Sequence, residues 1–471
     1  MGKFHSTMSR RQFMEALGLA GAGLGAAAIA APTFHDMDEV LASSSNSSWK
    51  NPWWVKNREA ENPTVEIDWS RIQRYDMNQV QTGDYQAIQD KTNAMIKEMW
   101  GSNDSKELYK KWAQEGVQGL RLREQAVSNA IGAVQNGAKS GYTGITPDGL
   151  GVPRWQGTPE ENMHMMHVVS RFFGSITQSA TQLTDNTKKL IFSKVGNRTN
   201  VFKDVDQASQ TATESILPNK ANYAFAWGTR HPSDALKTGP GVVNNPYGYF
   251  FSTNAGVRIR QFVQNIGYLA VSSQPNLAGS SAFPAVTGMG EMSRAGSELM
   301  IPQHGNVLRY IDLMLTDLPL ESTPPIDAGM TRFCYTCKKC AIHCPTQSIS
   351  LEDPSWDTTG PWNNPGMKHW YFNYPSCNPF KSSFTPGYCG LCLTICTFTK
   401  YEDAMIHNIV KGTSSTTPVF NAFFHKMDDA MGYGRNRGGL EAHQDDTYVD
   451  DWWNIIGPEL GFLTHRGNFP G

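Results

Sequence analysis

The stretch Cys334-Tyr-Thr-Cys337-Lys-Lys-Cys340-Ala-Ile-His-Cys344-Pro345 carries four of the eight cysteines in this chain. The other four follow in a looser group: Cys377, then eleven residues, then Cys389-Gly-Leu-Cys392-Leu-Thr-Ile-Cys396. Three cysteines at two-residue spacing can surround one cubic iron–sulfur cluster, whereas a fourth, three residues later, points toward a second cluster. The doubled pattern therefore predicts a module like that of bacterial ferredoxins, with two [4Fe–4S] clusters.

The same spacing rule assigns ligands across the two groups. The expected ligands are Cys334, Cys337, Cys340 and Cys396 for cluster 1, and Cys344, Cys377, Cys389 and Cys392 for cluster 2. Four disulfides are the alternative, but disulfide frameworks are typical of small scaffolds that lack a core. Two departures from the pattern are modest. The long gap after Cys377 is expected to form a loop, and Thr397 stands where a proline follows Cys344.

Length and charge limit the classes of function. The chain has 471 residues, a formal net charge of −2 and a mean hydropathy of −0.44. This length predicts two or three domains with an ample core. Because the net charge is near zero, no large basic field favours nucleic acid as a partner.

The N-terminus reads Ser9-Arg10-Arg11-Gln12-Phe13-Met14 and continues into a Gly/Ala-rich run, Leu17–Ala31. Twin arginines before a weakly apolar run are typical of a Tat export signal. The run is shorter than the roughly 20 apolar residues that a spanning helix needs. Cleavage is expected after Ala30 or, preferably, after Ala42. Tat export of folded proteins suits a cofactor that is assembled in the cytoplasm.

Hydrophobic periodicity predicts both helices and strands before the cysteines. Helices are expected at Tyr85–Trp100, Ser105–Asn136, Met163–Phe173 and Ser252–Ile266, with Thr158 as an N-cap and Pro159 in the first turn. Strands are expected from Leu190, at Tyr223–Trp227, at Tyr268–Ser272 and at Tyr310–Leu315, and a late helix near Glu402–Val410. Alternating strands and helices indicate an α/β (α+β) domain ahead of the cysteine module, with Pro324-Pro325 at the boundary.

Clusters transfer single electrons, so the residues before Cys334 must hold the electron acceptor. No G-x-G-x-x-G follows a strand with an acid about twenty residues later, and no phosphate-binding G-x-x-x-x-G-K-[ST] occurs. A D-x-H-x-x-G cobalamin motif is also missing from the sequence. A Rossmann nicotinamide or flavin site is therefore not supported.

The whole chain nevertheless resembles the respiratory corrinoid-dependent reductive dehalogenases, particularly those acting on chlorinated ethenes. The resemblance is carried by the twin arginines, the long α/β region, the paired cluster motifs and Thr316-Asp317-Leu318-Pro319 before Pro324-Pro325-Ile326-Asp327. It implies a nitroreductase-like core that holds a base-off corrinoid, with an inserted ferredoxin-like module. Chloride would be removed from a small organohalide at Co(I), as the terminal step of organohalide respiration.

The resemblance also implies a division of the chain and a location for it. The expected parts are a Tat signal peptide (1–42), an N-terminal unit (43–157), a corrinoid-binding domain (158–325), a ferredoxin-like domain (326–404) and a C-terminal unit packing on the core (405–471). The protein would lie at the outer face of the cytoplasmic membrane, bound by a small integral-membrane anchor protein and reduced by a membrane electron donor.

A catalytic Tyr, Asn and Arg are implied by the family as well. The best matches are Tyr249, with Tyr247 and Phe250 as rivals, Asn276, and Arg309, with Arg294 as its rival. A phenol can donate the proton that replaces chloride if a cation stabilises the phenolate, and a guanidinium is permanently charged. The amide of Asn276 could orient the phenol or the halide.

Two other functions remain open at this point. An exported two-cluster electron-transfer subunit would need no long region before Cys334. A relative of the epoxyqueuosine reductases would share the corrinoid and the two clusters, but a tRNA substrate fits neither an export signal nor a chain without basic excess.

Overall fold

The computed structural model describes residues 51–122, 125–126, 147–231, 235–236, 239–272, 277–306, 308–384, 389–399 and 405–431. The export signal and Asn276 lie outside these residues. The helices are η2 (Met77–Gln81), α3 (Tyr85–Trp100), α4 (Ser105–Glu115), α6 (Pro147–Leu150), α7 (Pro159–Phe172), α8 (Asp185–Lys188), α10 (Asn244–Asn265), α11 (Ala282–Val286), α12 (Met330–Cys337), α13 (Lys339–Ile342), α14 (Tyr374–Ser382), α15 (Leu391–Thr394), α16 (Met405–Thr416) and α17 (Asn421–Ala430). The strands are β1 (Lys56–Asn57), β2 (Glu66–Ile67), β3 (Thr177–Gln182), β4 (Lys194–Val195), β5 (Arg198–Lys203), β6 (Ser209–Gln210), β7 (Glu214–Pro218), β8 (Tyr223–Arg230), β9 (Glu291–Met292), β10 (Leu299–Met300), β11 (Leu308–Thr316), β12 (Ile326–Asp327) and β13 (Met367–Lys368).

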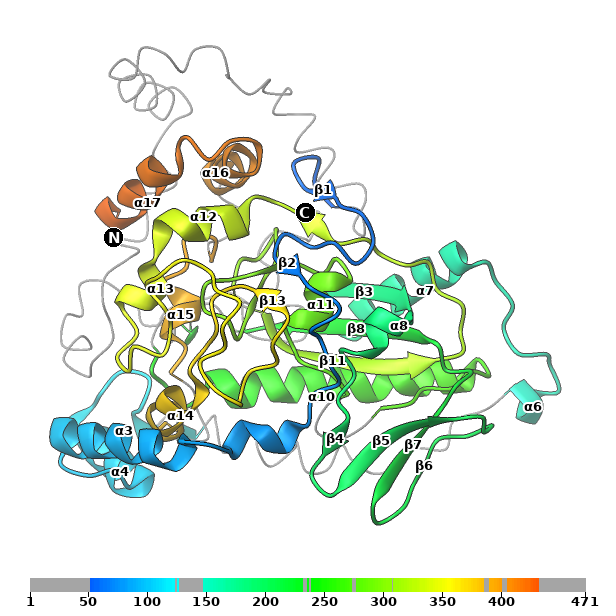
Figure 1. Cartoon of the computed structure of the whole chain (residues 1–471), viewed down its shortest axis with the longest axis horizontal. Coiled ribbons are helices and arrows are strands. Elements are labelled where there is room, and N and C mark those ends of the chain that lie inside the picture. The colour runs from blue at the N-terminus through cyan, green and yellow to red at the C-terminus, as the bar shows by residue number, and fades with distance from the viewer. Residues whose placement is uncertain are drawn as a thin grey trace.

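The centre of the molecule is a three-stranded antiparallel sheet in the order β11-β8-β3 (Figure 1). Ala226 of β8 pairs with Leu313 of β11 on one side and with Ser179 of β3 on the other. The register of β11 shifts between Arg309 and Asp312, where the strand is irregular. A separate sheet, β4-β5-β7-β6, lies apart from it. The sheet is antiparallel, so the fold has α+β character.

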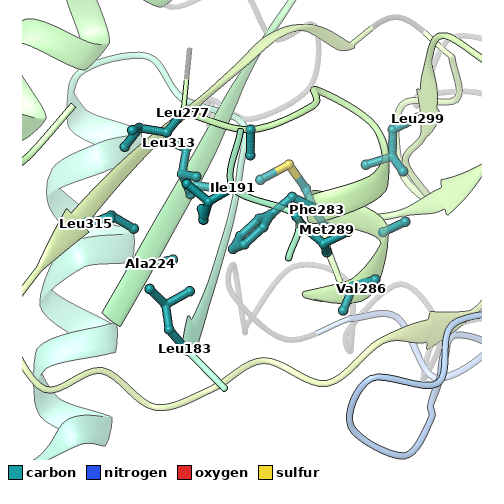
Figure 2. Packing of buried hydrophobic residues seen from close by; sticks show 14 of the residues in the cluster. Leu183, Ile191, Ala224, Leu277, Phe283, Val286, Met289, Leu299, Leu313 and Leu315 are labelled. Atoms are coloured by element: carbon teal, nitrogen blue, oxygen red, sulfur yellow. The ribbon is translucent and has the colours of Figure 1, made fainter. Parts of the chain in front are cut away.

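Side chains alternate between the two faces of β8 because successive residues of a strand point in opposite directions. Ala224 and Ala226 belong to a core that includes Leu313 and Leu315 of β11 and the residues of α11 (Figure 2). Phe225 and Trp227 belong to a second core, on the opposite face, which they share with α7 and α10. Both faces of the sheet are therefore buried.

Helix α10 runs along the sheet and contacts both β11 and β8 (Figure 1). It begins at Asn244, earlier than the expected Ser252. Its first turns contain Pro246 and Gly248, which disfavour helix in an isolated sequence. A proline is tolerated in the first turn because its missing N–H would have no partner there, and burial of Tyr247 adds tertiary stabilisation.

The cysteine-bearing segments do not form a separate body. Helix α14 packs against α3 from the N-terminal unit, and α12 packs against α16 and α17. Strand β12 pairs with β1, so the chain directly after Pro325 is tied to Lys56–Asn57. The orange C-terminal helices therefore contact the cysteine-bearing helix α12, drawn in yellow-green in Figure 1.

The remaining expected elements differ in how well they are confirmed. Helix α3 and the strands β8 and β11 lie where they were predicted, and α7 has the capping box of Thr158 with Glu161. The helix expected from Ser105 ends at Glu115, because Gly116 adopts a left-handed conformation. The expected strands at Leu190 and Tyr268–Ser272 were wrong: only single bridges, Ile191 to Ala278 and Val271 to Leu315, form there.

Candidate functional site

Short helices and the turns beside them carry the cysteines. Cys334 and Cys337 lie in α12, Cys340 in α13, Cys377 in α14 and Cys392 in α15. The other three each lie two residues beyond an end of α13 or α15: Cys344, Cys389 and Cys396. All eight are free thiols, so none of the four disulfides considered for this chain forms.

The thiols interact in two groups. The nearby thiols of Cys340, Cys396 and Cys337 help to raise the pKa of Cys334. These four cysteines border one space of about 360 Å³, a volume that includes open solvent. Thr397 lies 3.7 Å from the Sγ of Cys337, on the same side of that space. We call this group of four thiols the first cysteine group.

The second cysteine group comprises Cys344, Cys377, Cys389 and Cys392. The nearby thiol of Cys344 helps to raise the pKa of Cys377. Cys377 and Cys344 do the same for the pKa of Cys389, and Cys389 does so for the pKa of Cys392. The two groups are adjacent, because Cys344 is close enough to affect the pKa of Cys340, and Cys340 is close enough to affect the pKa of Cys392. The ligand assignment stays a prediction, and this grouping of the thiols favours it.

Burial disfavours the ionised form of these thiols. It raises the pKa of Cys337 to about 11 and that of Cys377 to about 12, and it raises the pKa of Cys334 well above its usual range. Among the described residues, no three His, Cys, Asp or Glu side chains are close enough to hold a single metal ion. A cubic cluster fits this arrangement better than one ion does, because each thiolate binds a different iron at the corner of a wide cube.

Arg294 lies at the first cysteine group. Its side chain is 1% exposed, and its Nε donates a hydrogen bond to the carbonyl oxygen of Cys334 at 3.0 Å. The guanidinium stacks over the ring of Trp370, with its Cζ 4.4 Å from the ring centroid. Burial lowers the pKa of Arg294, and Cys334, Cys340 and Cys337 act in the opposite direction. The structure therefore puts this rival for the catalytic arginine beside the cluster 1 cysteines.

Tyr249 lies in the first half of α10 and is half-buried. Burial raises the pKa of Tyr374 of α14 to about 12, with smaller contributions from Tyr85, Cys377 and Tyr249. Tyr249 is therefore close to Tyr374. Tyr374 is also close to Cys377 of the second cysteine group, so Tyr249 and Cys377 both neighbour the Tyr374 phenol. Tyr247, the rival of Tyr249, is buried, with its ring centroid 4.3 Å from that of Phe251.

The other two predicted catalytic residues are only partly described. The backbone of Arg309 pairs with that of Thr229 near the start of β11, but its side chain lies outside what the structure describes. Asn276 lies outside the described residues altogether.

Comparisons with known proteins identify the family. A family model described as the reductive dehalogenase subunit matches residues 50–320. The chain is 31% identical, over 98% of its length and 99% of the relative, to the chloroethene reductive dehalogenase of Dehalococcoides mccartyi strain VS. The chain belongs to the reductive dehalogenase family. It is equally similar, at 31% over 98% of both chains, to the trichloroethene reductive dehalogenase of Dehalococcoides mccartyi strain ATCC BAA-2266 / KCTC 15142 / 195.

Solved structures of reductive dehalogenases share the fold. The catabolic reductive dehalogenase NpRdhA, in complex with 3-bromo-4-hydroxybenzoic acid, aligns with a TM-score of 0.56 and 18% identity. The alignment covers 82% of this chain and 50% of NpRdhA, so the chain spans about half of that protein's length. A second structure, reported with a mechanism for B12-dependent dehalogenation, aligns with a TM-score of 0.55. At this level of identity the likeness establishes the mixed α/β fold of a reductive dehalogenase.

Membership of the reductive dehalogenase family makes the chain an oxidoreductase that acts on carbon–halogen bonds, rather than a carrier of electrons alone. Within the described part of this dehalogenase, no helix is long and apolar enough to cross a membrane.

Sequence reasoning missed Tyr374 and the position of Arg294. Tyr374 lies three residues before Cys377 on α14, and residues at this spacing share a face of a helix. The spacing could have marked Tyr374 as a neighbour of the second cysteine group. For Arg294 the sequence has no comparable signal, because its contacts with Cys334 and Ser350 join segments that are distant in the chain.

Proposed function

We propose that this reductive dehalogenase removes chloride from a small organohalide, with a chlorinated ethene as the preferred substrate. The observation that carries the proposal is the 31% identity, over nearly the full length of both chains, to relatives named chloroethene and trichloroethene reductive dehalogenase. Tyr249 of α10 lies near Tyr374, which precedes Cys377 of the second cysteine group. A proton donor and an entry point for electrons are thus neighbours in a chain whose near full-length relatives act on chlorinated ethenes.

The two cysteine groups fit two [4Fe–4S] clusters. Cys334, Cys337, Cys340 and Cys396 would hold cluster 1. Cys344, Cys377, Cys389 and Cys392 would hold cluster 2. When bound, the clusters supply single-electron transfer and a base-off corrinoid supplies the cobalt centre at which the carbon–halogen bond is cleaved. The proximity of Cys340 to Cys344 and Cys392 supports electron transfer between the two groups.

Buried polar side chains of the core suit a corrinoid, whose rim carries amide groups. Ser252 of α10 is fully buried, and Thr229, His304 and Asn306 are at most 7% exposed. The Nδ2 of Asn306 donates to the carbonyl oxygen of Cys392 at 3.4 Å, while its Oδ1 finds no donor in the described part of the chain. A buried acceptor of this kind needs a donor, and because Asn306 borders the space of the first cysteine group, this acceptor does not by itself mark the corrinoid site.

The catalytic roles follow from the chemistry of the side chains. Replacement of chloride by hydrogen requires two electrons and one proton, and the Oη of Tyr249 would donate that proton. The permanent charge of Arg309 would stabilise the phenolate that remains, because an opposite charge favours the ionised form. Asn276 would orient the phenol or the departing halide through its amide N–H groups.

Domain organisation and location belong to the same proposal. A corrinoid-binding, nitroreductase-like core (158–325) would carry an inserted ferredoxin-like module (326–404), flanked by units at 43–157 and 405–471. The twin-arginine signal (1–42) would direct Tat export to the outer face of the cytoplasmic membrane. There a small integral-membrane protein would anchor the enzyme and a membrane donor would reduce it. The net charge of −2 does not favour nucleic acid as a partner.

Metal analysis and turnover of the anaerobically purified protein test this function. We expect about eight iron atoms, as two [4Fe–4S] clusters require, and one cobalt per chain. Chloride release should be driven by reduced methyl viologen on a panel from tetrachloroethene to vinyl chloride. Active protein that contains iron but no cobalt would contradict the proposal. So would cobalt-replete protein that is inactive on every chlorinated ethene but active on chlorinated phenols, which would refute the substrate class.

A further inference from the structure

Arg294 is a buried cation whose hydrogen-bond acceptors are neutral. Beyond its bond to Cys334, the Nη1 donates to the carbonyl oxygens of Ser350 at 2.7 Å and Glu352 at 2.9 Å. The Nε of Trp370 donates to the same Glu352 carbonyl, which fixes the ring under the guanidinium. These contacts hold the guanidinium plane rigidly, so its remaining nitrogen, Nη2, has a defined position.

A buried charge requires a counter-charge, because transfer of an isolated ion from water to a protein interior is costly. Lys339, which borders the same space, meets this requirement through ion pairs with Asp428 and Asp429. No carboxylate accepts a hydrogen bond from Arg294 within the described residues. The thiols of Cys334, Cys340 and Cys337 each raise the pKa of Arg294 more than the carboxylate of Asp353 does.

The Nη2 of Arg294 is buried and has no hydrogen-bond partner in the described part of the chain. The same side chain borders the space lined by Cys334, Cys337 and Cys340. A guanidinium N–H without a protein acceptor, held rigidly beside four thiols, is suited to donate to an anion in that space.

We infer that Arg294 donates an Nη2–H hydrogen bond to a sulfur of cluster 1 and raises the reduction potential of that cluster. The inference rests on the proposed cluster ligands and adds a positioning and tuning residue to them. Reduction adds one negative charge to a cluster, and a fixed cation with an N–H donor stabilises the reduced form more than the oxidised form. Arg294 therefore keeps cluster 1 reducible by a donor of moderate potential.

A redox titration of the anaerobically purified holoenzyme, followed by electron paramagnetic resonance, tests the inference without substrate. We expect Arg294→Gln to lower the equilibrium constant for reduction of cluster 1 at least tenfold, which is about 59 mV for one electron. Arg294→Lys keeps the charge but loses the planar fork, so its shift should be smaller. The cluster 1 signal is assigned as the one that changes in Cys337→Ser.

Arg332 provides a matched control. It lies two residues before Cys334 on α12, and it is directed to Asp327 and the carbonyl oxygen of Ser415 instead of the cluster space. Arg332→Gln removes the same charge from the same region and should shift the cluster 1 equilibrium less than threefold. An equal shift in both variants would show a general charge effect and would overturn the hydrogen bond to the cluster.

Two results overturn the inference directly. One is an Arg294→Gln protein with both clusters and a cluster 1 equilibrium within twofold of the wild type. If that variant does not assemble cluster 1, the wild-type enzyme labelled with ¹⁵N-arginine decides by electron–nuclear double resonance. Among the described residues, Arg294 is the sole arginine that borders the space, so a strong ¹⁵N coupling is expected and its absence refutes the contact. The proposed function fails separately, if the wild-type enzyme carries both clusters and the corrinoid but releases no chloride from any chlorinated ethene.

Discussion

We expect Glu291 to give the cysteine-bearing region a pH-dependent stability. Its side chain is 1% exposed, and one carboxyl oxygen accepts hydrogen bonds from the backbone N–H groups of Ala328 at 3.0 Å and Met330 at 2.9 Å. Met330 begins α12, the helix that carries Cys334. Burial, and secondarily the nearby charge of Asp327, raises the pKa of Glu291 from 4.5 to about 7.

The sign follows from proton binding. The folded state binds this proton more tightly than the opened state, so the stabilisation is complete below pH 4.5 and is lost as the pH rises through about 7. A difference of about 2.5 pKa units corresponds to about 3.4 kcal/mol at 1.36 kcal/mol per unit. About 2.5 kcal/mol of this falls between pH 5 and pH 8, where opening of the start of α12 should become nearly a hundredfold more favourable.

Glu291→Gln keeps the acceptor for both backbone N–H groups and removes the ionisation. Hydrogen exchange of a peptide covering Ala328 and Met330, measured at matched pH, should be similar in variant and wild type at pH 5. At pH 8 the variant should exchange between tenfold and a hundredfold more slowly. Glu321→Gln replaces an exposed carboxylate and serves as the control. It should leave the exchange of this peptide unchanged at both pH 5 and pH 8. Equal protection of wild type and Glu291→Gln at pH 8 would refute the argument.

Three further predictions concern the ligands, the proton donor and a helix cap. Cys344→Ser should lose about half of the iron and the cluster 2 signal while keeping that of cluster 1; loss of cluster 1 instead, seen by electron paramagnetic resonance, would contradict the crossed assignment. Tyr249→Phe should lower turnover of chlorinated ethene about 10² to 10⁴-fold with unchanged iron and cobalt, whereas Tyr247→Phe should retain most activity; equal activities would remove Tyr249 from the mechanism. Thr158→Ala should cost about 1 kcal/mol at the start of α7, because Thr158 accepts from the backbone N–H of Glu161 at 3.2 Å; thermal unfolding of the two proteins measures this, and an unchanged midpoint contradicts it.

Local signals in the sequence predicted the elements that local interactions determine. The Thr158 cap and the amphipathic pattern of Tyr85–Trp100 act within a few residues, and both elements lie where they were expected. The early end of the helix expected from Ser105 also has a local cause, since Gly116 adopts a left-handed conformation that ends α4. The early start of α10 has a different origin. Burial of its first turns against the rest of the protein outweighs the unfavourable propensity of Pro246 and Gly248.

Cysteine spacing is informative because cluster geometry fixes which thiolates can meet, whereas the role of an arginine depends on what surrounds it. Arg294 and Arg309 are both permanently charged and lie within one region of sequence. Arg294 follows β9 into a turn whose Gly296 has a positive φ of 72°, and a Cβ at that glycine would lie 2.4 Å from the carbonyl oxygen of Trp370. The close approach that only glycine allows brings the ring of Trp370 under the guanidinium. Replacement of Gly296 by alanine should therefore displace Arg294 from cluster 1 without touching a cysteine, so the position of this charge is determined by backbone packing rather than by the motif itself.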